Sequence, residues 1–231
     1  MNSMPFNYYS PKFPQTLALE LFNMLLDKLD TTVTVAEWTR IFARCMGGDC
    51  LSNEDKAEVI LPASGTIWST KILPNFNPFG VHHVVLDQGC IHTGIHSSGV
   101  QAMDTSELGT KVLKIWNSRV AELRTHFPNV CTVVLLKGDS LSRVSVYEEE
   151  TIQFLPEKYY WQWDEHGNLE GCEKGTNTHR FSWQPHGSQF TVVSDVPDNR
   201  LKLRIKRPPV ISQSAVLDSI AYDDSWIEIV P

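Results

Sequence analysis

The stretch Gly65-Thr66-Ile67-Trp68-Ser69-Thr70-Lys71-Ile72-Leu73 decides the fold that we expect for this chain. It follows Glu58-Val59-Ile60-Leu61-Pro62, and two short β-prone runs joined by a glycine-containing turn predict a hairpin. Successive side chains of a strand point to opposite faces of a sheet, so Ser69 and Lys71 should share one face. The lysine near the end of this strand is the feature that most needs a chemical explanation.

Two helices are predicted before the hairpin. Leucines at four-residue spacing give residues 15–29 one apolar face, which is the period of a helix. Thr34 and Glu37 have the spacing of a capping box, so a second helix should run over 34–46. The pair Gly47-Gly48 is expected to end it.

A long helix and a buried strand are predicted after the hairpin. Asp104 and Glu107 also have capping-box spacing, and apolar residues keep a helical period over 105–127. Residues 130–136 are almost entirely apolar, which is typical of a central strand that is covered on both faces. A further strand is expected at 81–86, between the hairpin and the long helix.

The remaining segments are predicted to be loops and short strands. Residues 49–56 read as a polar loop, and residues 87–103, rich in glycine, serine and histidine, as a functional or surface loop. Short strands are expected at 143–147, 151–155, 159–164, 181–183, 189–194 and 201–205. No repeat or linker divides the chain. We therefore expect one domain over 1–231, in which 1–139 hold a helical arm and a core and 140–231 form a β-rich elaboration.

The predicted order of elements is helix, hairpin, strand, long helix, strand, or α-β-β-β-α-β. This is the core order of the PD-(D/E)xK nucleases, in which helices flank a mixed central sheet. The expected fold class is therefore α/β (α+β), with a restriction-endonuclease-like core. Element order alone does not establish function.

Composition narrows the classes of function. The net charge of −7 argues against nucleic-acid binding unless positive charge is concentrated locally. The five cysteines include no C-x-x-C pair, which argues against a zinc cage and favours reduced thiols, with Cys131 as a core residue. No apolar run is long enough to span a membrane, and no signal peptide is evident, so a cytoplasmic protein without a membrane partner is expected.

The hairpin could hold the catalytic groups of a metal-dependent phosphodiesterase. Such an enzyme needs carboxylates for Mg²⁺ and a lysine that positions or activates the attacking water. Candidate metal ligands are Glu58 on the first strand of the hairpin, Asp55 just before it, and Glu20 on the first helix. Lys71 would act on the water, and Ser69 stands where a second acid would be expected. The alternative is that Lys71 is simply an exposed lysine at a strand end.

Four segments resemble those of type II restriction endonucleases of the PD-(D/E)xK superfamily. They are the strand Gly65 through Leu73, the segment Leu135-Leu136-Lys137-Gly138, Tyr159-Tyr160-Trp161-Gln162-Trp163 through Gly167-Asn168-Leu169-Glu170-Gly171, and His179 through Thr191. The catalytic strand is similar to a variant in which serine replaces the second acid. Where such proteins often carry a polar Gly-Arg segment, this chain has Asp87-Gln88-Gly89-Cys90. The resemblance covers roughly residues 55–209 and implies Mg²⁺-dependent cleavage of double-stranded DNA.

Two segments of the β-rich half are candidates for DNA contact. The turn Pro185-His186-Gly187-Ser188-Gln189 could present His186, Ser188 and Gln189 to bases or phosphates, or it could be an ordinary tight turn. Strict alternation over 200–207 places Lys202, Arg204 and Lys206 on one strand face, which would suit a phosphate track. A charged, solvated edge strand is the alternative.

Histidines and tryptophans receive structural interpretations. His82, His83, His92 and His96 lack carboxylates or cysteines at ligand spacing and are taken as polar side chains of the surface. Trp161, Trp163 and Trp183 could stack on bases but are expected to be core residues.

The leading hypothesis is a type II restriction endonuclease that acts as a homodimer on a palindromic site in double-stranded DNA. Glu58, with Asp55 or Glu20, would bind Mg²⁺, Lys71 would orient or deprotonate water, and Ser69 would hold a water molecule. One rival is a non-catalytic DNA-binding protein whose two N-terminal helices form a helix-turn-helix. Another is a β-rich interaction module for carbohydrate or protein, with the tryptophans as its platform.

Overall fold

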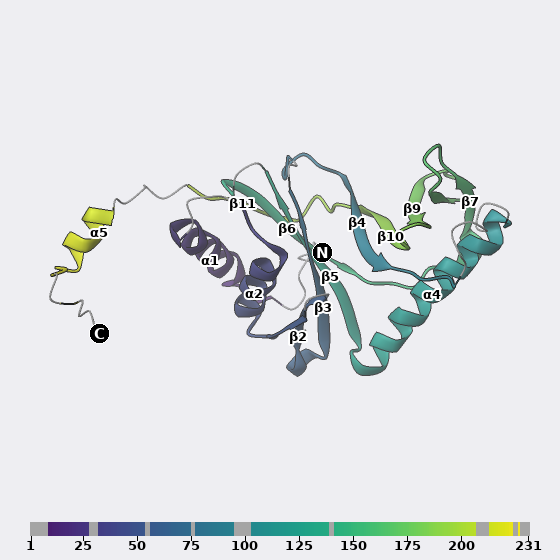
Figure 1. Ribbon diagram of the computed structural model, residues 1–231. Helices are drawn as coiled ribbons and strands as arrows, with labels where there is room; N and C mark the ends of the chain where they lie inside the picture. Colours follow the sequence, from purple (N-terminus) through teal and green to yellow (C-terminus); the bar gives the residue numbers. More distant parts are fainter. Residues whose placement is uncertain are drawn as a thin grey trace, which may run out of the picture.

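Two β-sheets and the helices packed on them make up the computed structural model of this chain (Figure 1). The structure describes residues 9–27, 32–53, 56–74, 77–94, 103–138, 141–206, 213–223 and 226. The mixed α and β content confirms the expected class. Outside the two sheets and their main helices lie the 3₁₀ turns Pro62–Ser64 and Pro156–Lys158 and the short helix α5 (Gln213–Ser219).

Sheet A has the strand order β1-β2-β3-β5-β6-β11. Its strands are β1 (Asp49–Asn53), β2 (Lys56–Leu61), β3 (Thr66–Leu73), β5 (Asn129–Lys137), β6 (Arg143–Glu150) and β11 (Leu201–Arg204). β3 and β5 are parallel, and every other neighbouring pair in this sheet is antiparallel. β11 therefore runs in the same direction as β3 and β5, and these three strands end at the same edge of the sheet.

Helices α1 (Phe13–Asp27) and α2 (Val35–Met46) cover one face of sheet A (Figure 1). The predicted capping box of α2 is present, and Gly47 ends the helix in the left-handed conformation. On β3 the side chains that face these helices are Trp68, which packs edge-on against Phe42 of α2, and Thr70, whose hydroxyl lies 2.6 Å from that of Thr39. Because side chains alternate along a strand, Ser69 and Lys71 face the opposite side.

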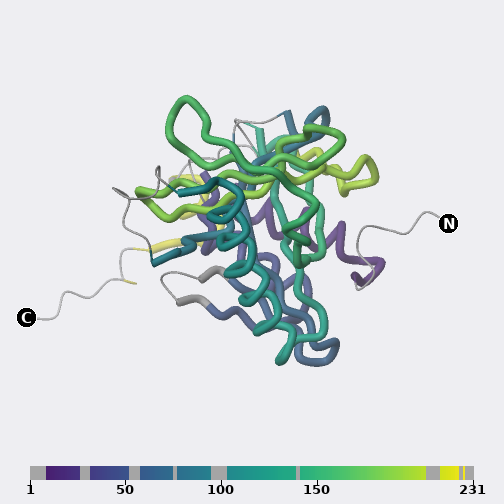
Figure 2. Tube along the Cα trace, turned by 90° about the vertical axis from the view of Figure 1, so that its right-hand side faces the viewer, coloured from purple at the N-terminus to yellow at the C-terminus, as the bar shows by residue number. Residues whose placement is uncertain are grey.

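The connection from β3 to β5 contains β4 and the long helix α4 (Thr105–His126). Asp104 caps α4 by accepting a hydrogen bond from the Glu107 amide, as the sequence predicted. After the helix, the Asn129 amide donates to the Gly65 carbonyl at 3.2 Å, so the start of β5 lies beside the β2–β3 turn (Figure 2). A parallel pair needs such a long crossover.

Sheet B is antiparallel and has the strand order β4-β10-β9-β8-β7. Its strands are β4 (His83–Cys90), β7 (Tyr159–Trp163), β8 (Leu169–Glu173), β9 (His179–Gln184) and β10 (Gln189–Asp195). One face of this sheet packs on α4 through an aromatic core that includes Trp116, Trp161, Phe181 and Phe190.

The edge strand β1 shows that the prediction of a loop at 49–56 was wrong. β1 pairs with β2 over five residues, although its sequence Asp-Cys-Leu-Ser-Asn has little strand preference. Pairing to an existing strand outweighs such weak local preference. The strand expected at 81–86 is β4 and belongs to sheet B, so the three strands of the predicted α-β-β-β-α-β order do not lie in one sheet.

Two further strand predictions were wrong for identifiable reasons. Residues 151–155 form no strand, because the carbonyls of Ile152 and Phe154 accept hydrogen bonds from the side chains of Trp116 and Asn117 on α4. Strand β8 was not predicted, since Gly171 lies at its centre. A side chain at Gly171 would meet the Trp161 ring at 2.8 Å, so the glycine admits that ring.

Other expectations are confirmed within the described residues. The predicted helix 15–29 corresponds to α1, although Leu29 lies outside the described residues. Cys131 is buried, and none of the five cysteines is in a disulfide. Among the helices that the structure describes, none combines the length and apolar character needed to cross a membrane.

Candidate functional site

The predicted catalytic residues of the hairpin lie together on the face of sheet A that is turned away from α1 and α2. Glu58 of β2 is the direct cross-strand partner of Ser69 of β3. Directly opposite residues of neighbouring strands share a face and lie about 5 Å apart. Lys71 is two residues further along β3 on the same face. Glu58, Ser69 and Lys71 therefore form one patch.

Lys71 is half-buried and is not the exposed lysine of the alternative interpretation. Its neighbour on β5 is Val134, which is fully buried together with Leu136 beneath strand β4. Burial lowers the pKa of Lys71 below 10.5, while the negative charges of Asp87 and Glu58 oppose this shift. With a lowered pKa, a larger fraction of the Lys71 amine is neutral at a given pH than for a fully solvated lysine.

Asp87 of β4 is a charged neighbour of Lys71 that the sequence analysis did not assign to the site. Its carboxylate accepts a hydrogen bond from the Gly89 amide at 2.6 Å and another from the side-chain amide of Gln189 on β10. Gln189 was predicted to contact DNA, and here its side-chain amide donates to Asp87. The sequence signal for Asp87 was an acid directly after the apolar run Val84-Val85-Leu86.

The three predicted metal ligands do not lie together in the described part of the structure. Glu58 lies in the Lys71 patch, and Asp55 is outside the described residues. Glu20 does not join them, because α1 packs on the opposite face of sheet A and the Glu20 carboxylate pairs with Arg44 of α2 at 2.6 Å. The prediction that Glu20 completes the site is therefore wrong.

The patch of Glu58, Ser69 and Lys71 contains one carboxylate, that of Glu58. Nowhere in the described residues do three His, Cys, Asp or Glu side chains lie close enough together to hold a metal. Mg²⁺ commonly binds through only one or two protein carboxylates and takes its other oxygens from water and substrate phosphates. Glu58 has the donor chemistry for such a site, and Asp87 is a second negative charge that acts on Lys71.

A row of basic residues lies at one edge of sheet A, on the same face as Lys71. The register Lys71–Val134–Tyr147 fixes this face across β3, β5 and β6. Period-two alternation then adds Arg143 of β6 and its partner Arg204 of β11. Lys202 of β11 follows by the same alternation and is exposed, as Arg204 is.

The basic row and the Lys71 patch lie at the same end of the sheet. Arg204 ends β11, and Lys71 is near the end of β3, which runs in the same direction. Three strand spacings and an offset of four residues along the strands separate Arg204 from Lys71, which together give roughly 20 Å. The Arg204 guanidinium stacks over the Phe79 ring at 5.7 Å, which holds the segment between β3 and β4 against this row. Lys206 is exposed just beyond β11.

The turn between β9 and β10 carries the other predicted DNA contacts. His186 is exposed at this turn, and Ser188 adopts a left-handed backbone with φ of 51°. Gln189 follows and begins β10. The turn thus connects an exposed histidine to the residue that binds Asp87.

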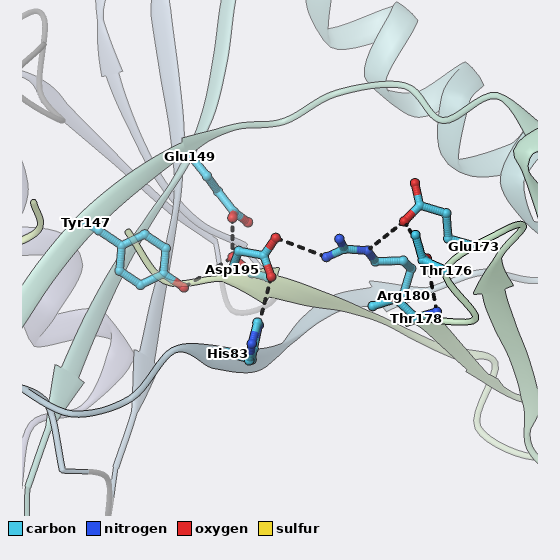
Figure 3. Close-up of polar contacts among 9 residues, drawn as sticks. His83, Tyr147, Glu149, Glu173, Thr176, Thr178, Arg180 and Asp195 are labelled. Carbon is cyan, nitrogen blue, oxygen red and sulfur yellow. Dashed lines mark hydrogen bonds and ion pairs between the residues drawn. The ribbon is translucent and has the colours of Figure 1, made fainter. Parts of the chain in front are cut away.

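A second polar network crosses the outer face of sheet B (Figure 3). Asp195 of β10 lies between His83 of β4 and Arg180 of β9, with His83 Nδ1 at 2.8 Å and an Arg180 nitrogen at 3.2 Å. Arg180 also approaches Glu173 of β8 at 3.9 Å. Burial raises the pKa of Asp195, but the hydrogen bonds from His83 and Arg180 outweigh it and lower the pKa. His83 was expected to be a polar surface histidine, and it is exposed and paired with Asp195.

A third polar group joins the two sheets in the interior. The Ser194 hydroxyl of β10 donates to the Glu149 carboxylate of β6 and lies 3.4 Å from the Tyr147 hydroxyl (Figure 3). Burial raises the pKa of Glu149, the bond from Ser194 lowers it, and the charge of Asp195 raises it again. The net direction is upward.

The tryptophans pack as expected. Trp161 and Trp183 are 6% and 1% exposed, and Trp163 packs at the border of the same core. They are therefore not a surface platform for bases or sugars. The second helix is equally unsuited to reading DNA, because its apolar face is buried on sheet A and Arg44 is paired with Glu20.

Comparison with known proteins adds no assignment. No protein-family model, no curated protein and no solved structure matches this chain. The functional argument therefore rests on the geometry of the Lys71 patch and the basic row.

Proposed function

We propose that this protein is a Mg²⁺-dependent endonuclease that cleaves double-stranded DNA at specific sites, in the manner of type II restriction enzymes. The observation that carries the proposal is the Lys71 patch. A half-buried lysine shares a sheet face with Glu58 and Ser69, and the strands that bear them are followed by a helical crossover to a parallel strand. A restriction-endonuclease-like core is part of the same proposal.

Each residue of the patch has a role that follows from its chemistry. Glu58 would hold Mg²⁺, which supplies charge neutralisation at the scissile phosphate. Burial makes Lys71 a better proton acceptor, so it would orient the attacking water and take its proton. The Ser69 hydroxyl, opposite Glu58, would hold a water molecule by hydrogen bonding in the place of the missing acid.

The basic row would hold the DNA. Lys202, Arg204 and Arg143 lie on the same face as Lys71, so a duplex along this edge would place a phosphate near the patch. His186 and Ser188 on the β9–β10 turn are proposed to contact bases or phosphates. A homodimer would match a palindromic site, because a two-fold axis in the protein mirrors that of the DNA.

Cleavage of DNA tests the proposal directly. The full chain incubated with unmethylated phage DNA and Mg²⁺ is expected to give discrete fragments. Lys71→Ala should reduce cleavage by about 1,000-fold or more, since it removes the proton acceptor, and should leave DNA binding nearly unchanged. Lys114→Ala, which alters an exposed lysine of α4, is the matched control and should cleave normally. Undiminished cleavage by Lys71→Ala would show that the assignment is wrong.

A DNA-binding protein without cleavage activity is the second candidate. The observation that favours it is Ser69 at the position of an acid, together with the exposed Lys202 and Arg204. It predicts a gel shift with no cleavage in Mg²⁺. For either candidate function, the double variant Lys202→Ala with Arg204→Ala should bind DNA more weakly. The slope of log K against log salt concentration should become shallower by about 0.9 for each lost phosphate contact. An unchanged salt dependence would contradict DNA binding through the basic row.

A further inference from the structure

Two arginines face each other across the last pair of strands in sheet A. Arg143 at the start of β6 is the direct partner of Arg204 at the end of β11, so their side chains share one face about 5 Å apart at Cβ. Both side chains are exposed. Like charges placed directly opposite each other on neighbouring strands destabilise a sheet. The fold by itself therefore does not favour this pair.

No carboxylate of the described residues compensates the charge of the pair, since none forms an ion pair with Arg143 or Arg204. Three arginines elsewhere are paired with carboxylates at distances of 2.6, 2.6 and 3.2 Å, namely Arg44 with Glu20, Arg124 with Glu150 and Arg180 with Asp195. The chain has 27 acidic and 20 basic residues, so acids are not scarce. Two opposed arginines without acids therefore indicate a surface that is kept positive for an anionic partner.

The turn between β3 and β4 holds the Arg204 side chain in place. Its guanidinium lies over the Phe79 ring, 5.7 Å from the ring centroid, which is within the range of a cation–π contact. The turn is closed by hydrogen bonds from the Gly80 and Val81 amides to the Asn77 carbonyl. Because the ring restricts the long arginine side chain, less rotamer freedom is lost when an anion binds.

Buried polar side chains anchor the same turn from beneath. The Pro78 carbonyl accepts a hydrogen bond from the Ser145 hydroxyl at 2.6 Å and another from Nε of Arg200 at 3.2 Å. Nη1 of Arg200 also donates to the Pro197 carbonyl at 3.0 Å. Arg200 is 4% exposed, and its partners among the described residues are carbonyl groups rather than carboxylates. Because Pro78 and Phe79 are consecutive, Arg200 adds a third positive charge beside the exposed pair.

A phosphate group has the chemistry that two neighbouring guanidiniums bind. Guanidinium groups donate paired N–H bonds to phosphate oxygens, and the planar fork makes arginine the preferred residue for this contact. A phosphodiester carries its charge on two non-bridging oxygens that point in different directions. Each of these oxygens can accept hydrogen bonds from one arginine of the pair.

We propose that Arg143 and Arg204 form a clamp for one backbone phosphate of double-stranded DNA, with Phe79 as the positioning residue of Arg204. This inference rests on the proposed function, because it names a contact of the same duplex. The clamp lies roughly 20 Å from Lys71, which corresponds to about six base pairs at 3.4 Å each. The clamp therefore orients the duplex at a distance from the Lys71 patch and takes no part in hydrolysis.

Binding of a short labelled DNA duplex, followed by fluorescence anisotropy without Mg²⁺, tests the clamp. Arg143→Gln and Arg204→Gln should each weaken binding about tenfold. Their melting temperatures should be unchanged or slightly higher, because an opposing charge is removed. Arg40→Gln removes an exposed arginine of α2 on the other side of sheet A and is the matched control, which should bind normally. Undiminished binding by Arg143→Gln would overturn the clamp.

The salt dependence of binding shows whether the two arginines hold one phosphate. In the double variant Arg143→Gln with Arg204→Gln, the slope of log K against log salt concentration should become shallower by about 0.9, as for one phosphate contact. The loss of affinity should be smaller than the product of the two single losses, since both side chains act on the same group. A slope change of about 1.8 would mean two separate phosphates and would overturn the clamp.

Phe79→Leu separates positioning from packing. It keeps an apolar side chain on the turn and removes the ring face, so DNA binding should weaken roughly two- to fivefold. In the Arg204→Gln background the same substitution should leave the affinity unchanged, because the ring acts through that guanidinium. An unchanged affinity of Phe79→Leu alone, or an equal loss in both backgrounds, would overturn the positioning role.

A titration with inorganic phosphate separates this inference from the proposed function. In phosphorus NMR, the phosphate signal should broaden with the unmodified chain and stay sharp with Arg143→Gln. Normal DNA binding by Arg143→Gln would overturn the clamp and leave the nuclease proposal standing. A chain that binds phosphate through Arg143 but binds no duplex would overturn the proposed function and assign the clamp to free phosphate compounds. A chain that binds neither would overturn both proposals.

Discussion

Sheets A and B cover their inner faces in different ways. Sheet B meets α4 with stacked and edge-on aromatic rings, such as Trp161 and Phe181 with centroids 5.9 Å apart. The face of sheet A that meets β4 carries both apolar and polar side chains. Leu73 and Val134 lie on this face together with Lys71 and Ser69. An aromatic core stabilises the fold, whereas a half-buried lysine costs stability. The contrast is that the sheet B core is closed by apolar rings, whereas the face of sheet A beneath β4 retains a charge that burial disfavours.

The largest expected effect on stability comes from Gly109→Ala in α4. A Cβ at this position would lie 2.1 Å from Cδ2 of Trp161, and Gly171 confines the same ring from the other side. Overpacking should lower the free energy of unfolding by about 3 kcal/mol, although alanine favours helix. Thermal denaturation followed by near-UV circular dichroism measures it. Gly187→Ala is the control, since the nearest atom to its Cβ is 4.0 Å away. Equal stability of the two variants would contradict the packing argument.

Lys71→Met should stabilise the protein, in contrast to Gly109→Ala. Removing a charge that burial disfavours should raise the free energy of unfolding by about 1 kcal/mol at pH 7, while cleavage is lost. Because the folded-state pKa lies below 10.5, the unmodified protein should gain stability as pH rises from that pKa to 10.5, and the variant should not. Chemical denaturation at pH 7 and pH 10 tests this. The exposed Lys114→Met should change little, and a destabilised Lys71→Met would mean that the lysine supports the fold.

Glu149 lies where the two sheets meet, and Glu149→Gln should alter how the stability of the protein depends on pH. The folded-state pKa of Glu149 is raised above 4.5, so its contribution to stability is present below that pH and is lost as pH rises through the folded-state pKa. The variant should therefore be more stable than the unmodified protein at pH 7 and similar at pH 4. Melting temperatures over this range measure the difference. The exposed Glu157→Gln should give parallel curves, and a less stable Glu149→Gln at pH 7 would refute the prediction.

The smallest effect is expected for Asp195→Asn on the outer face of sheet B. Its side chain is 61% exposed, so loss of its ion pairs with His83 and Arg180 should cost less than about 1 kcal/mol. Since the pKa of Asp195 is lowered, this contribution is present above pH 3.8 and fades as pH falls through the folded-state pKa. Denaturation in low and high salt measures it, with the 93% exposed Asp198→Asn as control. A loss of several kcal/mol would show that sheet B depends on this network.

Elements with strong local signals were predictable. The capping box of Thr34 and Glu37, the cap at Asp104 and the apolar run of β5 each placed an element within a few residues of its observed bounds. Short strands were less predictable, because β1 has little intrinsic preference and β8 contains Gly171. Their pairing depends on neighbouring strands that are distant in sequence.

The same division holds for the candidate site. Glu58, Ser69 and Lys71 could be grouped from sequence, since a hairpin with period-two alternation fixes which side chains share a face. Arg143 could not, because its place on the same face follows from the pairing of β6 with β5 and β11. Glu20 was misplaced for the same reason, since the sequence does not show which face of the sheet α1 covers.

The sequence by itself determined the hairpin, the two capped helices α2 and α4 and the buried strand β5, because periodicity and caps are local properties. Only the tertiary structure decided that β4 joins sheet B and packs over sheet A beside Lys71. That arrangement depends on burying Val84 and Leu86 against Val134 and Leu136. Such contacts between distant segments are selected by packing of the whole chain, which no local pattern encodes.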